Sequence, residues 1–291
     1  MLRALLARWK SSLQLLRPTQ AQAQRAKIAV AQVDHCYSNK VVALKDVNLN
    51  VHSGEFVCLL GPSGCGKSTL LYALAGQLVP TGGTVSIDDQ RIRGPGPERL
   101  LMFQEAALFP WMTVLGNLKF ALAARGVPRA ARTPRALEFI RRVHLSGFED
   151  TLPHQLSGGM KMRVSLARTL AADPAVLLMD EPFAALDAQT RIHMQELLQS
   201  IWMRTRKTVV FVTHDVHEAL MLGTRVVLMA PRPGRIVKDL EVHLPMPRSL
   251  EDRKLNEMAR YLRVLMRQVD EPSQASEPMD PPLGEAVGLH H

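Results

Sequence analysis

The stretch GPSGCGKST at residues 61–69 constrains the fold of this sequence more than any other. An apolar run, EFVCLL, precedes it, and a run of helix-forming residues, LLYALAG, follows it. Glycines at such a strand-to-helix turn let successive backbone N–H groups face one point, where the new helix adds its positive dipole end. The pattern predicts a phosphate-binding loop in which Lys67 pairs with the β- and γ-phosphates and Ser68 ligates Mg²⁺. The residues expected to contact the nucleotide here are Gly61, Pro62, Ser63, Gly64, Cys65, Gly66, Lys67, Ser68 and Thr69.

A second apolar run, AVLLM at residues 175–179, ends in two acids, Asp180 and Glu181. Carboxylates at the end of a buried strand beside a phosphate loop are suited to holding Mg²⁺ and to activating water. We expect Asp180 to hold the metal, directly or through water, and Glu181 to polarise the attacking water as a general base. These residues predict a protein that hydrolyses ATP or a close relative of ATP.

A second anion site is predicted at LSGGM, residues 156–160. Ser157 can cap the helix that begins there, while Gly158 and Gly159 leave backbone N–H groups uncovered at its positive end. One small protein with two phosphate-binding helix starts requires an explanation that composition and spacing do not supply.

The order of GPSGCGKST, LSGGM and LLMDEP resembles the nucleotide-binding subunit of ABC transporters. The resemblance covers residues 28 to about 240 and implies a P-loop NTPase fold of the α/β class, with an antiparallel β subdomain and a helical subdomain. It assigns Tyr37 to adenine stacking, Gln104 to sensing Mg²⁺ and water, and His214 to the γ-phosphate, and it identifies Asp187 with the D-loop. The sequence departs from the family at three places. Met160 stands where Gln is usual, residues 161–163 (KMR) stand where Gln-Arg or Gln-Gln-Arg is usual, and Thr224 stands where Asp is common.

The family's geometry implies an answer to the question of the two anion sites. Two copies pair head-to-tail, and ATP lies between the phosphate loop of one copy and LSGGM of the other. Ser157 and Gly159 would then donate to the γ-phosphate held by the partner, through charge-assisted hydrogen bonds of about 1.5–3 kcal/mol each.

Short apolar runs alternate with helical patterns along the body of the chain, as expected for an α/β fold around a largely parallel sheet. We expect an ATPase domain at residues 28–245, whose helical subdomain covers about 104–172. A helical segment follows at 246–269, and residues 270–291, rich in proline and acids, are expected to be disordered. The arginines between Arg125 and Arg142 indicate a solvated helical face, with contact to lipid headgroups as the alternative.

Residues 1–27 form a basic extension that contains six cations and no acid. Leucines and Trp9 recur in it at helical spacing, up to Leu16, which is typical of an amphipathic helix on an anionic membrane surface. A leader without a specific role and an organelle transit peptide are the alternatives.

Three function classes fit a P-loop sequence: the ATPase of a membrane importer, a soluble ABC ATPase for nucleic-acid or protein-assembly work, and a kinase or GTPase. LSGGM, Asp187 and His214 disfavour the last. The distance along the chain from Lys67 to Asp180 holds one helical subdomain, which disfavours the long coiled coils of repair ATPases. The stretches 94–118 and 230–236 resemble the subfamily that imports nitrate, alkanesulfonates and taurine, in which Trp111 would receive a short helix of the membrane subunit; internal packing of Trp111 is the alternative.

The importer interpretation implies ATP and Mg²⁺ as cofactors and a second copy of the chain as partner. It also implies integral membrane permease subunits, an indirect link to an external substrate-binding protein, and no nucleic acid. The chain is expected at the cytoplasmic face of the bacterial inner membrane, as a peripheral subunit. No run reaches the ~18 apolar residues that a membrane span needs, and the transported anion cannot be read from this subunit.

Overall fold

The computed structural model describes residues 16–18, 25–38 and 40–270. Within these residues, seven strands form the main sheet, in the order β1-β11-β10-β4-β9-β8-β7. Their bounds are β1 Leu16–Pro18, β4 Phe56–Leu60, β7 Arg99–Met102, β8 Val176–Asp180, β9 Thr208–Thr213, β10 Arg225–Ala230 and β11 Arg235–Val242. The strands from β10 to β7 are parallel, while at one edge β11 pairs antiparallel with β10 and β1 pairs antiparallel with β11.

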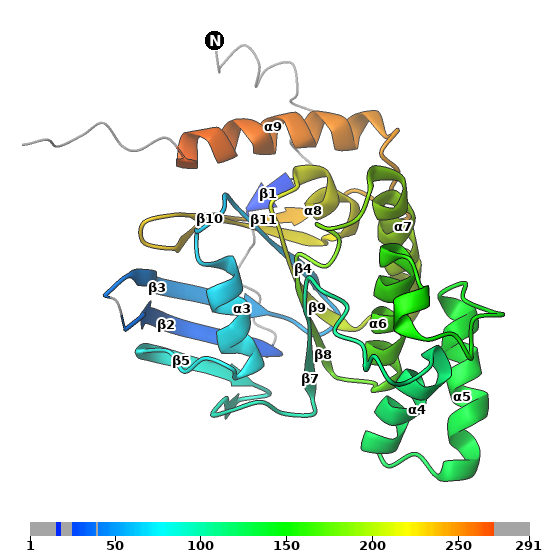
Figure 1. Ribbon diagram of the computed structural model, residues 1–291. Coiled ribbons are helices and arrows are strands. Elements are labelled where there is room, and N and C mark those ends of the chain that lie inside the picture. The colour runs from blue at the N-terminus through cyan, green and yellow to red at the C-terminus, as the bar shows by residue number, and fades with distance from the viewer. Residues whose placement is uncertain (1–15, 19–24, 39, 271–291) are drawn as a thin grey trace, which may run out of the picture.

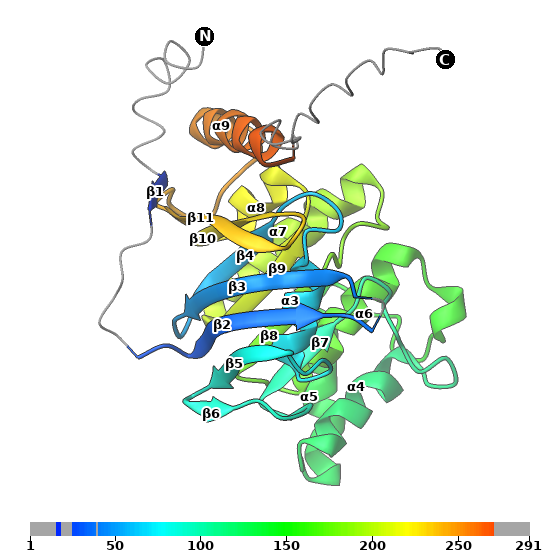
Figure 2. The same cartoon turned by 90° about the vertical axis from the view of Figure 1, so that its left-hand side faces the viewer.

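A second, antiparallel sheet of the described chain has the order β3-β2-β5-β6. Its strands are β2 Ile28–Cys36, β3 Val42–Val51, β5 Gly82–Ile87 and β6 Gln90–Arg91. Helix α3, Lys67–Ala75, lies between the two sheets (Figures 1 and 2). The apolar side chains of α3, β4 and the antiparallel sheet form one core, so the helix that follows the phosphate loop is held on both sides. This arrangement confirms the α/β fold with an antiparallel β subdomain.

The helical subdomain extends from the end of β7 to the start of β8 (Figure 1). Its elements are α4 Val114–Ala124, α5 Arg129–Arg142, the short 3-10 helix η1 Pro153–Gln155 and α6 Gly158–Ala171. Helix α6 packs against α4, α5 and the long helix α7, Ala188–Thr205, which joins the subdomain to the main sheet. The predicted helical insertion is thus confirmed.

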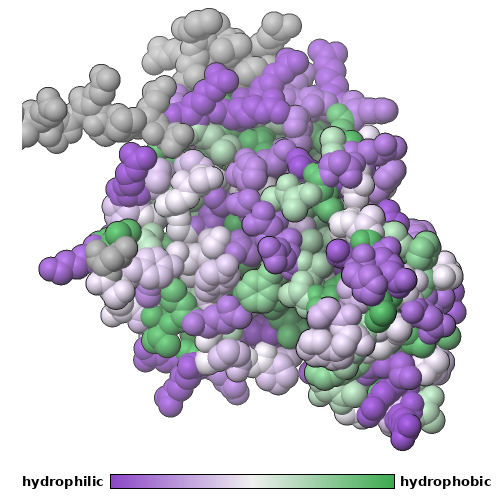
Figure 3. Space-filling model, in the orientation of Figure 1, coloured by the Kyte–Doolittle hydropathy of each residue, from purple (hydrophilic) through white to green (hydrophobic). Residues whose placement is uncertain are grey.

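The C-terminal helix α9, Arg253–Asp270, lies over α8, Val216–Leu222. It buries Leu255, Met258, Ala259 and Leu262 completely, and its outer side is hydrophilic at the top of Figure 3. The apolar positions repeat at three- and four-residue spacing, the pattern of a helix with one face on a core.

The N-terminal extension corrects one expectation. Leu16 was expected to belong to an amphipathic helix, but it is buried in β1 and pairs with Val242 of β11. A strand places successive side chains on opposite faces, so a helical stripe cannot include this residue. The remainder of the expected helix, residues 1–15, lies outside the described residues. The expected disordered tail at 270–291 also lies outside them, except for its first residue, Asp270, which is the last residue of α9.

Candidate functional site

The phosphate loop connects β4 to α3 and curls around the ammonium group of Lys67. Lys67 Nζ donates to the carbonyl oxygens of Gly61 and Pro62, at a distance of 2.9 Å in both cases. Gly66 has a φ of 88°, and a Cβ there would lie 2.7 Å from Leu44, so glycine is required at this helix start. The loop therefore presents a buried cation and free helical N–H groups at one point, the chemistry of a phosphate site.

Asp180 ends β8 directly beside the first turn of α3. Ser68 Oγ donates to Asp180 Oδ1 at a distance of 2.8 Å, and the Tyr72 hydroxyl donates to Asp180 Oδ2 at the same distance. Ser68 and Tyr72 are four residues apart and therefore share one face of the helix. Burial, followed by the neighbouring Asp180, raises the pKa of Tyr72 to about 12, so the phenol keeps its proton at neutral pH.

The donor set at this point fits Mg²⁺. Asp180 is almost fully buried, and its carboxylate lies next to the Ser68 hydroxyl. Both groups supply oxygen atoms, the ligand type that Mg²⁺ prefers. Because Mg²⁺ usually keeps several waters and takes only one or two protein ligands, Asp180 and Ser68 form a sufficient protein contribution.

Glu181 and His214 lie together on the same edge, because β8 and β9 are parallel neighbours in register. His214 Nδ1 is 2.9 Å from Glu181 Oε2. Glu181 has a φ of 42°, and its N–H donates to the carbonyl of Val212, so the backbone turns sharply after the buried strand. Non-glycine residues in this conformation are strained and cluster at functional sites. A carboxylate held by an imidazole beside a phosphate loop is suited to positioning water.

Gln104 lies two residues beyond β7, whose Met102 pairs with Met179 of β8. This register brings Gln104 to the same edge as Glu181, which lies two residues beyond Met179. The Gln104 side chain is exposed and makes no hydrogen bond to any residue in the described part of the chain. The structure therefore brings Gln104 to the site without connecting it to Asp180.

Tyr37 reaches the phosphate loop from the antiparallel sheet. Its hydroxyl is 3.0 Å from Thr69 Oγ1, and the residue as a whole is 42% exposed. The His35 ring meets it edge-on, with centroids 4.7 Å apart. An exposed aromatic face anchored beside the loop is available for stacking.

LSGGM lies at the start of α6, in the helical subdomain. Ser157 caps this helix by accepting from Met160 N–H over 3.3 Å, and Gly158 is exposed. Gly159 faces the start of α7, where a Cβ on it would lie 2.4 Å from the methyl group of Thr190.

Asp187 caps α7 by accepting from the N–H of the same Thr190 over 3.0 Å. This hydrogen bond is the first-named cause that lowers the pKa of Asp187. Thr190 thus connects LSGGM to Asp187, whereas no described hydrogen bond connects either of them to the phosphate loop. The two predicted anion sites belong to different subdomains.

Two parts of the site are not evident from the sequence. Tyr72 stands among leucines at helical spacing and gives no signal apart from its hydroxyl. Arg263, Met266 and Arg267 of α9 line a cavity of about 350 Å³ together with Pro62 and His214, so the C-terminal helix reaches the phosphate edge.

The aromatic residues that follow Gln104 lie on the surface. Trp111 is 71% exposed, which excludes internal packing of this ring in the described chain, and it contacts Phe109 with centroids 5.7 Å apart. Phe109 also meets Phe120 at 4.6 Å. Within the described residues, no helix has both the length and the apolar character needed to cross a membrane.

Comparison with known proteins assigns the site to a family. The family model described as ABC transporter matches residues 44–184. An uncharacterized ABC transporter ATP-binding protein of Methanocaldococcus jannaschii is 50% identical over 228 residues, which are 78% of this chain and 84% of the relative. A taurine import ATP-binding protein of Burkholderia pseudomallei is 51% identical over 215 residues, 73% of this chain and 83% of the relative.

Solved structures agree with the sequence relatives. A dimeric ATP-binding cassette in a post-hydrolysis state, bound to ADP and Pi, superposes with a TM-score of 0.65 at 33% identity; the match covers 75% of this chain and all of that one. A component of an ABC transporter complex of Clostridium perfringens gives a TM-score of 0.70 at 25% identity, covering 84% of this chain and 98% of that one. The chain belongs to the ABC transporter family, as an ATP-binding protein whose ATPase activity is coupled to transport across a membrane.

Proposed function

We propose that this chain is the ATP-hydrolysing subunit of a membrane importer for a small anion such as taurine, another sulfonate or nitrate. The observation that carries this proposal is the 51% identity to a taurine import ATP-binding protein over most of both chains. The alternative of a soluble ABC ATPase for nucleic-acid or assembly work has no comparable support among these relatives.

The contacts at the phosphate edge support a role in catalysis for each of these residues. Lys67, which contacts the loop carbonyls, would pair with the β- and γ-phosphates of ATP, and Asp180 and Ser68 would hold Mg²⁺. When bound, this ion supplies charge neutralisation at the phosphate oxygens. Glu181 accepts the proton of the attacking water, and His214 holds the Glu181 carboxylate in position.

Three further positions complete the nucleotide site. Gln104 reaches towards the metal and water from the neighbouring strand end, Tyr37 stacks on the adenine, and Thr69 orients Tyr37 through its hydroxyl. A base–aromatic stack of this kind contributes about 1–3 kcal/mol.

A second copy of the chain closes the site. Ser157, Gly158 and Gly159 of that copy would donate to the γ-phosphate, while Asp187, tied to the same Thr190, would lie at the junction between copies. The separation of the two anion sites into different subdomains supports a head-to-tail pair, because one copy alone cannot bring both motifs to one phosphate.

The permease is proposed to dock on the aromatic surface beside Gln104. Trp111 and its neighbour Phe109 offer an exposed aromatic anchor, the residue type that most often dominates binding at protein interfaces. The chain would then act at the cytoplasmic face of the membrane as a peripheral subunit, linked through the permease to an external substrate-binding protein.

Two experiments test this function. Glu181→Gln is expected to form a dimer in saturating Mg-ATP, measured by analytical ultracentrifugation, because hydrolysis no longer separates the copies. The matched control, Glu181→Gln combined with Lys67→Ala, should stay monomeric, and a monomeric single variant would contradict the closed pair. A detergent pull-down of the tagged chain from native membranes is expected to recover a polytopic permease, and recovery of soluble proteins or nucleic acid alone would overturn import.

A further inference from the structure

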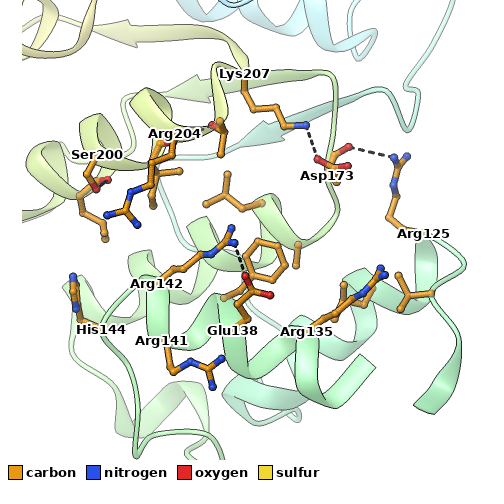
Figure 4. A pocket seen from close by; sticks show the side chains of 18 residues that line it. Arg125, Arg135, Glu138, Arg141, Arg142, His144, Asp173, Ser200, Arg204 and Lys207 are labelled. Carbon is orange, nitrogen blue, oxygen red and sulfur yellow. Dashed lines mark hydrogen bonds and ion pairs between the residues drawn. The ribbon is translucent and has the colours of Figure 1, made fainter. Parts of the chain in front are cut away.

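A cavity of about 830 Å³ lies where the helical subdomain meets the far end of the main sheet (Figure 4). Helix α5 forms one wall, and the C-terminal end of α7, with Arg204 and Thr205, forms another. Asp173, three residues before β8, and Lys207, directly before β9, complete the rim. The cavity therefore lies at the end of the sheet where these two strands begin.

This position separates the cavity from the nucleotide site. Asp180 and His214 lie at the opposite ends of the same two strands. Helix α7 starts at its cap Asp187 and first lines the cavity ten residues later, at Leu197. At 1.5 Å per residue, these two positions are about 15 Å apart along the helix, and Thr205 lies about 27 Å from Asp187. A ligand in the cavity cannot touch the phosphates.

The rim of the cavity is strongly cationic. Among the described residues that line it, two are acids, and both are already paired, Glu138 with Arg142 and Asp173 with Lys207. The cations that line it are Arg125, Arg135, Arg141, Arg142, Arg204 and Lys207. Excess positive charge around a concavity raises the local concentration of anions.

Three of these cations are uncommitted. The side chains of Arg135, Arg141 and Arg204 make no hydrogen bond or ion pair with any residue in the described part of the chain, and all three residues are exposed. Figure 4 shows Arg135 of α5 and Arg204 of α7 on opposite sides of the cavity, with Arg142 between them, so guanidinium groups from both helices border it. Planar guanidinium forks match carboxylate, sulfonate and phosphate oxygens.

The floor of the cavity is apolar. Side chains from both subdomains form it, namely Leu122, Val127, Phe139, Leu170, Leu197 and Ile201. A simple inorganic anion would leave this surface in contact with water. An apolar body laid on it gains about 25 cal/mol for each Å² of apolar surface removed from water.

We propose that this cavity binds an amphipathic organic anion, whose acidic head pairs with an arginine on one side of the rim, Arg135 of α5 or Arg204 of α7, and whose apolar body covers the floor between these two helices. The volume is within the range of small-molecule sites, about 300–1,000 Å³. The mixture of a cationic rim with an apolar floor favours this ligand over an acidic protein segment, which would need a longer groove. Such a ligand would connect the helical subdomain to the main sheet away from the ATP.

The test uses dodecanoate as the probe, with isothermal titration calorimetry on the full chain. Saturable binding at one site is expected, with a Kd tighter than about 1 mM. Arg135→Glu combined with Arg204→Glu should weaken it at least about tenfold, because two attractions become repulsions. The matched control is Arg129→Glu, which makes the same charge change on α5 outside the cavity and should leave the Kd within about twofold, since exposed charges that do not contact the ligand are screened by salt.

Two further ligands separate the contributions of head and body. Dodecyltrimethylammonium carries the same chain with a positive head, and acetate carries the same head without the chain; both should bind much more weakly than dodecanoate. Equal binding of dodecanoate to the double variant, or equal binding of the cationic analogue, would overturn the proposal. So would the absence of saturable dodecanoate binding, including the case in which a short poly-glutamate peptide binds instead.

Discussion

Tyr72 and Ser68 hold the two oxygens of Asp180 from the same face of α3. The Tyr72 hydroxyl donates to Oδ2 and the Ser68 hydroxyl donates to Oδ1, each at a distance of 2.8 Å. The tyrosine therefore fixes the carboxylate that we propose as the holder of Mg²⁺, without occupying the oxygen next to Ser68. Groups that orient a metal ligand in this way typically change metal affinity 10–100-fold when removed.

We accordingly expect Tyr72→Phe to raise the Mg²⁺ concentration needed for half-maximal ATPase activity about tenfold, because Asp180 loses the donor that orients it. The rate at saturating Mg²⁺ should change much less. Tyr37→Phe is the matched control: it removes a hydroxyl that contacts Thr69 instead of Asp180. If both variants showed the same Mg²⁺ dependence as the original chain, Tyr72 would not position the metal ligand.

The head-to-tail arrangement predicts complementation between two inactive variants. Ser157→Arg should bind ATP normally but lack turnover, because the bulky cation blocks the site on the partner. Lys67→Ala should lose nucleotide affinity in its own loop. A mixture of the two contains pairs in which an intact loop meets an intact LSGGM, so ATPase activity should reappear on mixing and rise with the concentration of the second protein. An inactive mixture would argue against sharing of sites between copies.

The buried carboxyl group of Glu218 should make the free energy of unfolding depend on pH. Its carboxylate is buried at 5% exposure and accepts hydrogen bonds from Thr213 and Gln195. Burial raises its pKa above the ordinary value of 4.5, and Asp215 adds to this, while both hydrogen bonds and Arg191 oppose it. The folded state therefore binds this proton more tightly than the unfolded state does. Stability is highest below pH 4.5 as far as this group is concerned, and it falls as pH rises towards the folded pKa.

Glu218→Gln cannot ionise, so its free energy of unfolding should lack this decrease. Urea denaturation of both proteins at a series of pH values above 4.5 measures the difference, which should grow in favour of the variant with rising pH. Glu196→Gln, on the exposed face of α7, is the control and should follow the original chain. A constant difference between Glu218→Gln and the original chain would show that the carboxyl does not titrate as inferred.

The sequence predicts the elements that carry strong local signals. The phosphate loop, α3, β8 and β9 combine solid apolar runs with glycines or terminal acids, and these local preferences agree with the final fold. Strand β1 has three residues and exists only through pairing with β11, which lies more than two hundred residues away in the chain. No local sequence pattern predicts the pairing of two strands so far apart in the chain.

Side-chain relationships between distant segments are the other part that sequence cannot supply. Tyr72 has the helical spacing of a core residue. Its hydroxyl reaches Asp180 only because β8 lies beside α3 in the fold. The sequence alone predicts a solvated helical face for the arginines of α5. In the structure they form one wall of a cavity, because α7 and the residue before β9 form the facing walls. Their roles depend on the fold more than on spacing.

Cys65 shows how burial alters an expectation about reactivity. Its position within the phosphate loop suggests that thiol reagents block nucleotide binding. The side chain is fully buried beneath the loop, and Lys67 Nζ is 3.8 Å from its sulfur. Burial raises the pKa of the thiol, with partial compensation from Lys67, so little reactive thiolate is present at neutral pH.

We expect N-ethylmaleimide to modify the partly exposed Cys36 rapidly, without loss of ATP binding, and Cys65 only slowly, as the loop opens. Each slow modification should abolish one nucleotide site, because the adduct cannot fit under Gly61, where even a Cβ would lie 2.7 Å from the Cys65 sulfur. Mass spectrometry of the labelled peptides over time, with ATP binding measured on the same samples, follows both reactions. Cys36→Ser should remove the fast phase and keep the slow one. If Cys65 reacted as fast as Cys36, or if its full modification left ATP binding intact, the loop would not enclose this thiol in solution.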